Sequence, residues 1–250
     1  HAALFGQGCH SPGMIKATYG TGSSIMMNIG GKFVASKNGL ATSLAWGIGG
    51  KADYVLEGNI NYTGAVITWL QEEIGLIDSP KEIQAAVAAA NPDDTTILVP
   101  AFSGLGAPYW NESAKALICG MTRSTGRNEL IKAAEECIAF QINDVIQAMK
   151  ADSGLAIEQI RVDGGPTKDS YLMQFQSDIS KVAITARRED ELSAMGAAYL
   201  AGISLGSYNM EELFSSTERT CYSPAMATET RHNKLKNWRE AVALIQNPGS

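Results

Sequence analysis

The chain has 250 residues, of which 45% are hydrophobic, 18% charged and 7% aromatic, a composition that excludes collagen-like, disordered and low-complexity chains. The formal net charge of −6 argues against nucleic acid as a partner, because contacts to phosphates need a basic face. The four cysteines lie far apart, with no CxxC pair, so they indicate neither a zinc site nor a disulfide framework.

The beginning of the chain is typical of a piece cut from a longer protein. It opens on His1 without an initiator Met and is apolar from the next residue, whereas native termini are usually polar. No apolar run approaches the ~20 residues of a membrane span, and no signal peptide is visible. We therefore expect a cytoplasmic protein without a membrane partner.

The first part of the chain predicts short strands followed by two helices. Alternating or apolar runs separated by glycine-containing turns are typical of hairpin strands. These runs cover residues 14–22, 24–29, 40–46 and 54–57. A helix is expected at 63–74, and a second begins after Ser79, the N-cap of a capping box with Glu82, and ends near residue 90.

Further along, strands alternate with helices. Strands are expected at 96–100, 159–163 and 182–185, and helices at 128–150, 168–179, 191–205 and 228–246. The longest helix has apolar residues at steps of three and four, and the helix at 191–205 is rich in small residues that allow a close approach to a neighbour. Hairpins followed by this alternation predict an α/β fold, a mixed sheet with flanking helices, in one large domain or two closely packed lobes.

Two glycine turns are candidate phosphate or nucleotide sites. In the first, a strand ends in Gly-Thr-Gly at 20–22, where backbone N–H groups and a hydroxyl can face a phosphate because glycine has no Cβ. A plain hairpin turn explains the same residues. In the second, a strand runs into Gly164 and Gly165 and then a helix, whose N-terminus offers free N–H groups. A structural turn capped by Thr167 or its neighbour is the alternative.

The other polar and aromatic groups carry weaker signals. The glycine-rich aromatic loop at 99–110 either lines a cleft or packs as a structural loop. His10 and His232 have no partners by spacing and are expected at the surface. The carboxylates show no acid–base spacing, so most are expected to be solvated or to cap helices; they are Asp53, Glu57, Asp144, Asp163 and Asp178.

Several long motifs, taken in order, resemble the C-terminal half of the FGGY carbohydrate kinases. They are AALFGQ (2–7), KATYGTGS (16–23), VPAFSGLGAPYW (99–110), DGGPTKDSYLMQFQSDI (163–179) and GAAYLAG (196–202). Their number and order make the resemblance specific, and it covers roughly residues 2–208. It implies a ribonuclease-H-like α/β fold, shared with actin and hexokinase. Residues 1–250 would form the C-terminal, ATP-binding lobe, and the sugar or polyol would lie between this lobe and an N-terminal one.

The resemblance also implies site residues. Those at cofactor-binding positions of the family are Gly20, Thr21, Gly64, Thr68, Gly164, Gly165 and Asp169. The first two fall where the family contacts the γ- and β-phosphates. Gly64 falls at another phosphate and ribose contact, with Thr68 one helical turn further along. Gly165 and Asp169 fall where the family cradles the adenosine.

Two positions depart from the family pattern. The members nearest to this pattern carry Asn where this chain has Asp169, on the adenine side of the site. They carry Phe, packed on the carbon atoms of the substrate, where this chain has Ser24. A hydroxyl in place of an apolar wall opens space and needs a partner, so Ser24 predicts a preference for a longer polyol or a ketose over glycerol.

The function implied is transfer of the γ-phosphoryl group of ATP, with Mg²⁺, to a hydroxyl of a small sugar or polyol. In the family the catalytic Asp stands just ahead of AALFGQ, so it is expected before His1 and no catalytic residue is assigned within the chain. Residues 1–250 alone are therefore expected to fold, to bind nucleotide more weakly than the whole kinase and to phosphorylate nothing. The surface that meets the N-terminal lobe would be exposed, which favours weak self-association into a homo-oligomer.

Two other functions fit parts of the sequence. One is a non-catalytic, actin-like nucleotide-binding module, but such a module has no need of the AALFGQ and APYW motifs. The other is a binding domain that takes no nucleotide. Unchanged thermal stability in excess Mg-ATP would support this last alternative.

Overall fold

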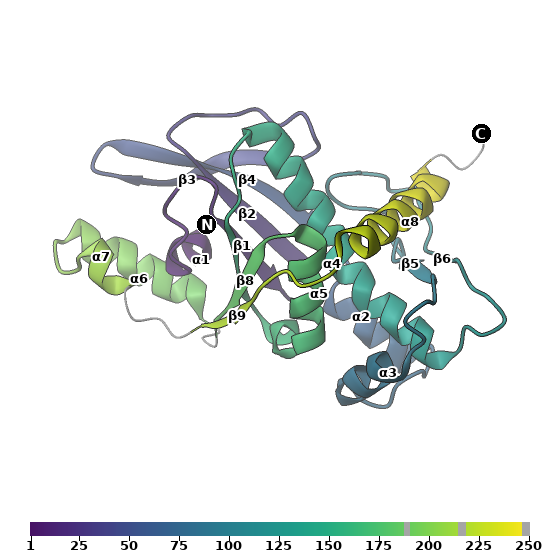
Figure 1. The fold of residues 1–250 in the computed structure, drawn as a ribbon. Helices are drawn as coiled ribbons and strands as arrows, with labels where there is room; N and C mark the ends of the chain where they lie inside the picture. The colour runs from purple at the N-terminus through teal and green to yellow at the C-terminus, as the bar shows by residue number, and fades with distance from the viewer. Residues whose placement is uncertain (188–190, 215–218, 247–250) are drawn as a thin grey trace.

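A seven-stranded mixed sheet, in the order β3-β4-β2-β1-β7-β8-β9, organises the chain (Figure 1). The computed structural model describes residues 1–187, 191–214 and 219–246. The strands of this sheet are β1 (Ile15–Tyr19), β2 (Ser23–Gly30), β3 (Ala41–Ile48), β4 (Lys51–Ile60), β7 (Gln159–Asp163), β8 (Ala183–Ala186) and β9 (Thr220–Tyr222). A separate two-stranded sheet pairs β5 (Ile97–Val99) with β6 (Leu117–Cys119).

The pairing of the strands follows the two halves of the sequence. The first four strands are antiparallel neighbours, as their hairpin turns predict. By contrast, β7 lies parallel to both β1 and β8, with Thr18 of β1 opposite Asp163 of β7. The carboxyl ends of β1 and β7 therefore meet at one edge of the sheet, which is where ligands bind in many α/β proteins.

Helices cover both faces of this sheet (Figure 1). The helices that the structure describes are α1 (Ala2–Gly6), α2 (Gly64–Thr68) with a π-helical continuation (Trp69–Glu73), α3 (Ile83–Ala89), α4 (Arg127–Ser153), α5 (Ser170–Ser180), α6 (Leu192–Ser204), α7 (Met210–Leu213) and α8 (Thr228–Gln246). The capping box at Ser79 is confirmed, because its Oγ accepts from the N–H of Lys81 and its own N–H donates to Glu82. The box opens a 3₁₀ turn (Pro80–Glu82) that leads into α3.

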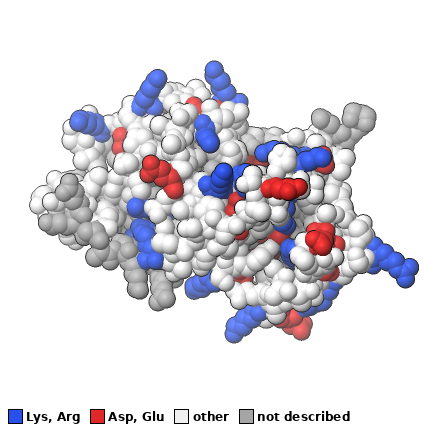
Figure 2. Space-filling model, in the orientation of Figure 1, with Lys and Arg blue, Asp and Glu red and all other residues white. Residues whose placement is uncertain are grey.

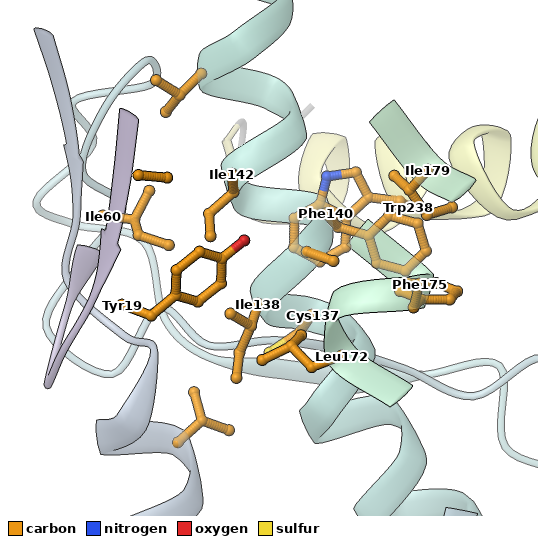
Figure 3. Packing of buried hydrophobic residues seen from close by; sticks show 14 of the residues in the cluster. Tyr19, Ile60, Cys137, Ile138, Phe140, Ile142, Leu172, Phe175, Ile179 and Trp238 are labelled. Carbon is orange, nitrogen blue, oxygen red and sulfur yellow. The ribbon is translucent and has the colours of Figure 1, made fainter. Parts of the chain in front are cut away.

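The larger core lies between the sheet and α4, α5 and α8. Tyr19 at the end of β1 is fully buried and points toward Ile138 and Ile142 of α4 in Figure 3. In the same figure the rings of Phe140 and Trp238 stack, with centroids 5.1 Å apart. These contacts fix α4 over the sheet and so place its side chains at the edge where β1 and β7 end.

A smaller core lies on the opposite face, because successive side chains of a strand point to opposite sides. Met26 and Val55 meet Leu4 and Phe5 of α1 there. The predicted close approach of the small-residue helix is confirmed: a Cβ on Gly196 of α6 would lie 1.8 Å from the carbonyl oxygen of Ala2. The missing side chain thus lets α1 and α6 touch through their backbones.

The prediction for His10 is wrong. Its ring lies 4.4 Å from the ring of Phe5 and 4.4 Å from that of Phe214, and its Nε2 contacts the carbonyl oxygen of Phe5 at 3.1 Å. Burial lowers the pKa of His10. The imidazole therefore completes the smaller core, whereas His232 is exposed as predicted.

The charged side chains on the surface are distributed as the net negative charge of the sequence suggests (Figure 2). On the face shown in Figure 2, basic and acidic side chains are interspersed, without a broad basic patch. In the part of the chain that the structure describes, none of the helices has both the length and the apolar character to cross a bilayer.

Candidate functional site

A cleft of about 760 Å³ opens between four segments at the edge where β1 and β7 end. Its volume is typical of small-molecule sites. One wall is formed by α2 and its continuation, with Gly64, Thr68 and Gln71, and a second by residues 80–84. Glu135 and Ile138 of α4 line it from the sheet side, and residues 165, 166, 168 and 169 close it.

The first glycine turn borders this cleft through α2. The carbonyl oxygen of Gly20 accepts from the N–H of Gly64 at 2.9 Å, and that of Thr21 accepts from the N–H groups of Thr63 and Ala65. A Cβ on Gly64 would lie 2.9 Å from the Gly20 oxygen. The amide of Gly64 is thus already engaged, and glycine is needed there so that the turn and the helix can touch.

The second glycine turn follows β7. Gly164 has a φ of +105°, and a Cβ there would lie 2.0 Å from the carbonyl oxygen of Tyr19, so this glycine joins β7 to β1. Gly165 is different, because nothing lies within 4 Å of the position of its Cβ. It opens a 3₁₀ turn (Gly165–Lys168) and lines the cleft.

The N-cap of α5 is Asp169, so the cap expected at Thr167 or its neighbour is wrong. The N–H groups of Tyr171 and Leu172 donate to its Oδ1 at 2.8 and 3.0 Å, while Thr167 donates from its hydroxyl to the carbonyl oxygen of Gly164. The helix predicted at 168–179 therefore begins at Ser170, and Lys168 belongs to the preceding 3₁₀ turn. Asp169 also lines the cleft.

The predicted site residues thus fall into three groups. Gly64, Thr68, Gly165 and Asp169 line the cleft together. Gly20, Thr21 and Gly164 do not line it, but the first two contact α2 at its rim and the third joins the strands beneath it. Ser24 lies apart from these residues, in a shallower hollow.

That hollow has a volume of about 340 Å³. Gly20 borders it as well, together with Thr18, Ser23 and Asn59. The hydroxyl of Ser24 donates to Oε1 of Glu57 at 3.4 Å. The turn at residue 20 therefore stands between the hollow at Ser24 and α2, which forms a wall of the larger cleft.

The aromatic loop at 99–110 is a structural loop. Among the residues that the structure describes, the lining of the larger cleft includes none from this loop. Tyr109 instead donates to Asp144 of α4 at 2.8 Å, Trp110 donates to the carbonyl oxygen of Gly39 at 2.6 Å, and the ring of Phe102 packs on Trp69. The loop supports α4 and the segment after α2 from outside.

Among the carboxylates expected to be solvated or capping, Asp163 and Asp178 are buried and Asp144 is half-buried. Asp144 accepts from Tyr109 and, at 2.6 Å, from Trp238, and burial raises the pKa of Asp144 to about 6. Asp163 accepts from the side-chain amide of Gln7, and Asp178 accepts from the backbone N–H groups of residues 225 and 226. Each has partners from distant segments, which local spacing does not reveal.

Sequence reasoning missed Glu135. Glu135 is only 2% exposed. Its burial, and to a smaller extent the negative charge of Asp169, raises the pKa of Glu135 to about 8. The signal was present in the sequence, because Glu135 stands four residues after Ile131 and three before Ile138 on the apolar face of the long helix. A carboxylate within such a face is buried or functional, since burying an acid without a partner costs free energy.

Comparison with known proteins gives a family match. The model of the "FGGY family of carbohydrate kinases, C-terminal domain" matches residues 15–205. A glycerol kinase of Brevibacillus brevis is 45% identical over 243 residues, which are 96% of this chain and 49% of that protein. A glycerol kinase of Burkholderia ambifaria is 46% identical over 244 residues, or 97% of this chain and 49% of its own length. The chain spans about half the length of these relatives.

Solved structures agree in fold. The crystal structure of Plasmodium falciparum glycerol kinase with ADP superposes with a TM-score of 0.90 at 35% identity, over 98% of this chain and 49% of that one. A ligand-bound xylulose kinase of Lactobacillus acidophilus gives a TM-score of 0.84 at 20% identity, over 97% of this chain and 49% of that one. The second likeness shows the fold alone.

Proposed function

The chain belongs to the FGGY family of carbohydrate kinases, and we propose that it forms the nucleotide-binding half of an ATP-dependent kinase that phosphorylates a small sugar or polyol. One observation carries the proposal: two glycine turns far apart in the sequence meet at the parallel ends of β1 and β7 and border one cleft. Phosphoryl transfer needs such an arrangement, because most of its catalysis comes from positioning and charge neutralisation.

The nucleotide would lie along this edge of the sheet. We assign the base and ribose to the larger cleft, where Gly165 leaves open space beside Asp169 and where Gly64 and Thr68 form the opposite wall. The phosphates would extend toward the turn of Gly20 and Thr21, which adjoins Gly64. The Plasmodium falciparum glycerol kinase, whose crystal structure contains ADP, supports an adenine nucleotide as the ligand.

Magnesium would arrive with the nucleotide. No group of three or more potential metal ligands occurs among the described residues. The proposal needs no preformed metal site, because Mg²⁺ in kinases is bound through one or two carboxylates and the substrate's phosphates rather than by a protein cage. When bound, the ion neutralises charge on the phosphates, and the role of this chain is to hold and orient the nucleotide.

The acceptor would lie in the hollow at Ser24. Gly20 borders this hollow and its turn contacts α2, so a hydroxyl held there would stand near the end of the phosphate chain. The general base would come from a part of the protein outside these 250 residues. The relatives compared above are glycerol kinases, which favours glycerol as the acceptor of this kinase too. The Ser24–Glu57 pair, however, offers polar partners to a longer polyol or a ketose.

Calorimetric titration of the chain with Mg-ATP tests the nucleotide half of this proposal, and the expected result is binding of one nucleotide. A substrate panel on the whole kinase tests the acceptor: we expect four- and five-carbon polyols or ketoses to exceed glycerol in kcat/KM. A glycerol preference would contradict the assignment of Ser24. Binding of ATP without transfer to any sugar or polyol would favour the non-catalytic module.

A further inference from the structure

Glu135 has an unmet hydrogen-bonding capacity. It is almost wholly buried, and its Oε2 has no hydrogen-bond partner among the residues that the structure describes. Asp144, by contrast, accepts from Tyr109 and Trp238, and Glu136 accepts from Lys234 at 2.8 Å. Buried polar groups nearly always have partners, and Glu135 lines a cleft, so a turn of its side chain toward a bound ligand would give the orphaned oxygen a partner.

The surroundings of Glu135 suit a flat aromatic ring. Glu135 lines the cleft together with Ile138 one helical turn later, and Ile67 and Ile83 line it from the opposite elements. Aliphatic walls hold a planar base by contact, and a few polar groups then fix its orientation. The other charged residues that line the cleft are Lys81, Lys168 and Asp169, on the segments before α3 and α5.

The protonation state of Glu135 decides what it can recognise. Burial and the neighbouring Asp169 raise its pKa to about 8, so the carboxyl is mainly neutral at pH 7. A neutral carboxyl presents one O–H donor beside one carbonyl acceptor. Adenine presents the complementary pair, an N6 amino donor beside a ring-nitrogen acceptor. An ionised carboxylate, with two acceptors, would match only half of it.

We propose that Glu135 recognises the adenine base, its carbonyl oxygen accepting from the N6 amino group while its hydroxyl donates to the adjacent ring nitrogen. This inference rests on the proposed nucleotide site and adds to it a residue that determines base specificity. It also explains why an acid stands within the apolar face of α4, since the ligand, and not the protein, completes its hydrogen bonds.

The experiment compares ATP with purine-riboside triphosphate, which lacks only the 6-amino group. Calorimetry at pH 7 on the wild-type chain is expected to show ATP binding about tenfold more tightly, the usual effect of one buried hydrogen bond. Glu135→Gln should keep this preference, because an amide also presents a donor beside an acceptor. Glu135→Leu should bind both nucleotides equally, with ATP weakened more than about tenfold, because both hydrogen bonds to the base are lost.

Glu136→Gln is the matched control, because the neighbouring Glu136 contacts Lys234 and Tyr171 and does not line this cleft. It should leave both affinities unchanged. Equal binding of the two nucleotides by the wild-type chain would overturn the inference without any variant, so a variant that fails to fold leaves the test intact. An ATP preference that survives in Glu135→Leu would also overturn it. If the wild-type chain binds neither nucleotide, the proposed function itself fails.

Discussion

Gly164 and Gly165 are consecutive, yet an added side chain would meet very different surroundings at the two positions. At Gly165 nothing lies within 4 Å of the Cβ position, and the side chain would enter the cleft. Gly165→Val should therefore fold normally, with an unchanged melting temperature, and lose nucleotide affinity by at least about tenfold, because the branched side chain occupies the place of the ligand. Calorimetry and circular dichroism measure the two effects.

The control for this variant is Gly164→Ala. Its Cβ would lie 2.0 Å from the Tyr19 oxygen, at a φ of +105°, so this smaller substitution should destabilise the fold by roughly 2 kcal/mol or more. Unaltered affinity in a folded Gly165→Val variant would exclude the turn from the nucleotide site.

Asp144 provides a prediction about pH. Burial raises its pKa from the ordinary 3.8 to about 6, so the native state binds this proton more tightly than the unfolded state. Its contribution to stability is complete below about pH 4 and is lost as the pH rises through 6. The free energy of unfolding of the wild type, minus that of Asp144→Asn, should fall by roughly 2 kcal/mol between pH 4 and pH 7.

Urea denaturation of both proteins across this range measures the difference, and the other titrating groups cancel in the subtraction. Asn keeps an oxygen that can accept from Tyr109 and Trp238, so the variant should fold at every pH tested. A difference that stays constant with pH would contradict the raised pKa.

At the scale of elements, the contact of α1 with α6 depends on a missing side chain. Gly196→Val would place a Cβ 1.8 Å from the Ala2 oxygen and 2.9 Å from the amide nitrogen of Gly6, so the two helices must separate. We expect a loss of roughly 3 kcal/mol or more in urea denaturation, because the smaller core opens as well. Ala197→Val, at the next and exposed position, should cost only the lower helix propensity of valine, about 0.5 kcal/mol. Equal stability of the two variants would show that the contact contributes little.

The elements that the sequence predicted well are those stabilised by their own periodicity. The helix expected at 128–150 is α4, Arg127–Ser153, and the helix expected at 228–246 has the predicted bounds. The strands β6 and β9, of three residues each, and the short helices α1 and α7 were missed. Such segments hold too few residues to show a period, and β6, β9 and α1 depend on a partner elsewhere in the chain.

At the scale of the molecule, the candidate site could be predicted in part. Local chemistry marked both glycine turns, because a strand that ends in glycines is visible in the sequence, whether a second strand or a helix follows it. Their meeting depends on the parallel pairing of β1 with β7, which joins segments separated by most of the chain. Glu135 became a candidate only after its burial and its orphaned oxygen were known.

The last prediction concerns catalysis by these 250 residues. The proposed function assigns the general base to another part of the kinase, and such a base alone contributes ~10²–10⁴-fold to the rate. The hollow at Ser24, which would hold the acceptor, is lined in this chain by residues of the nucleotide-binding half alone. The contacts by which the whole kinase orients its substrate would therefore be incomplete. We therefore expect the chain to bind Mg-ATP and to show no increase in ADP release when glycerol, a tetritol or a ketopentose is added. A coupled assay measures this, with the whole kinase as the positive control. Polyol-dependent ADP release by residues 1–250 alone would place the base within this chain and would contradict the assignment of the site.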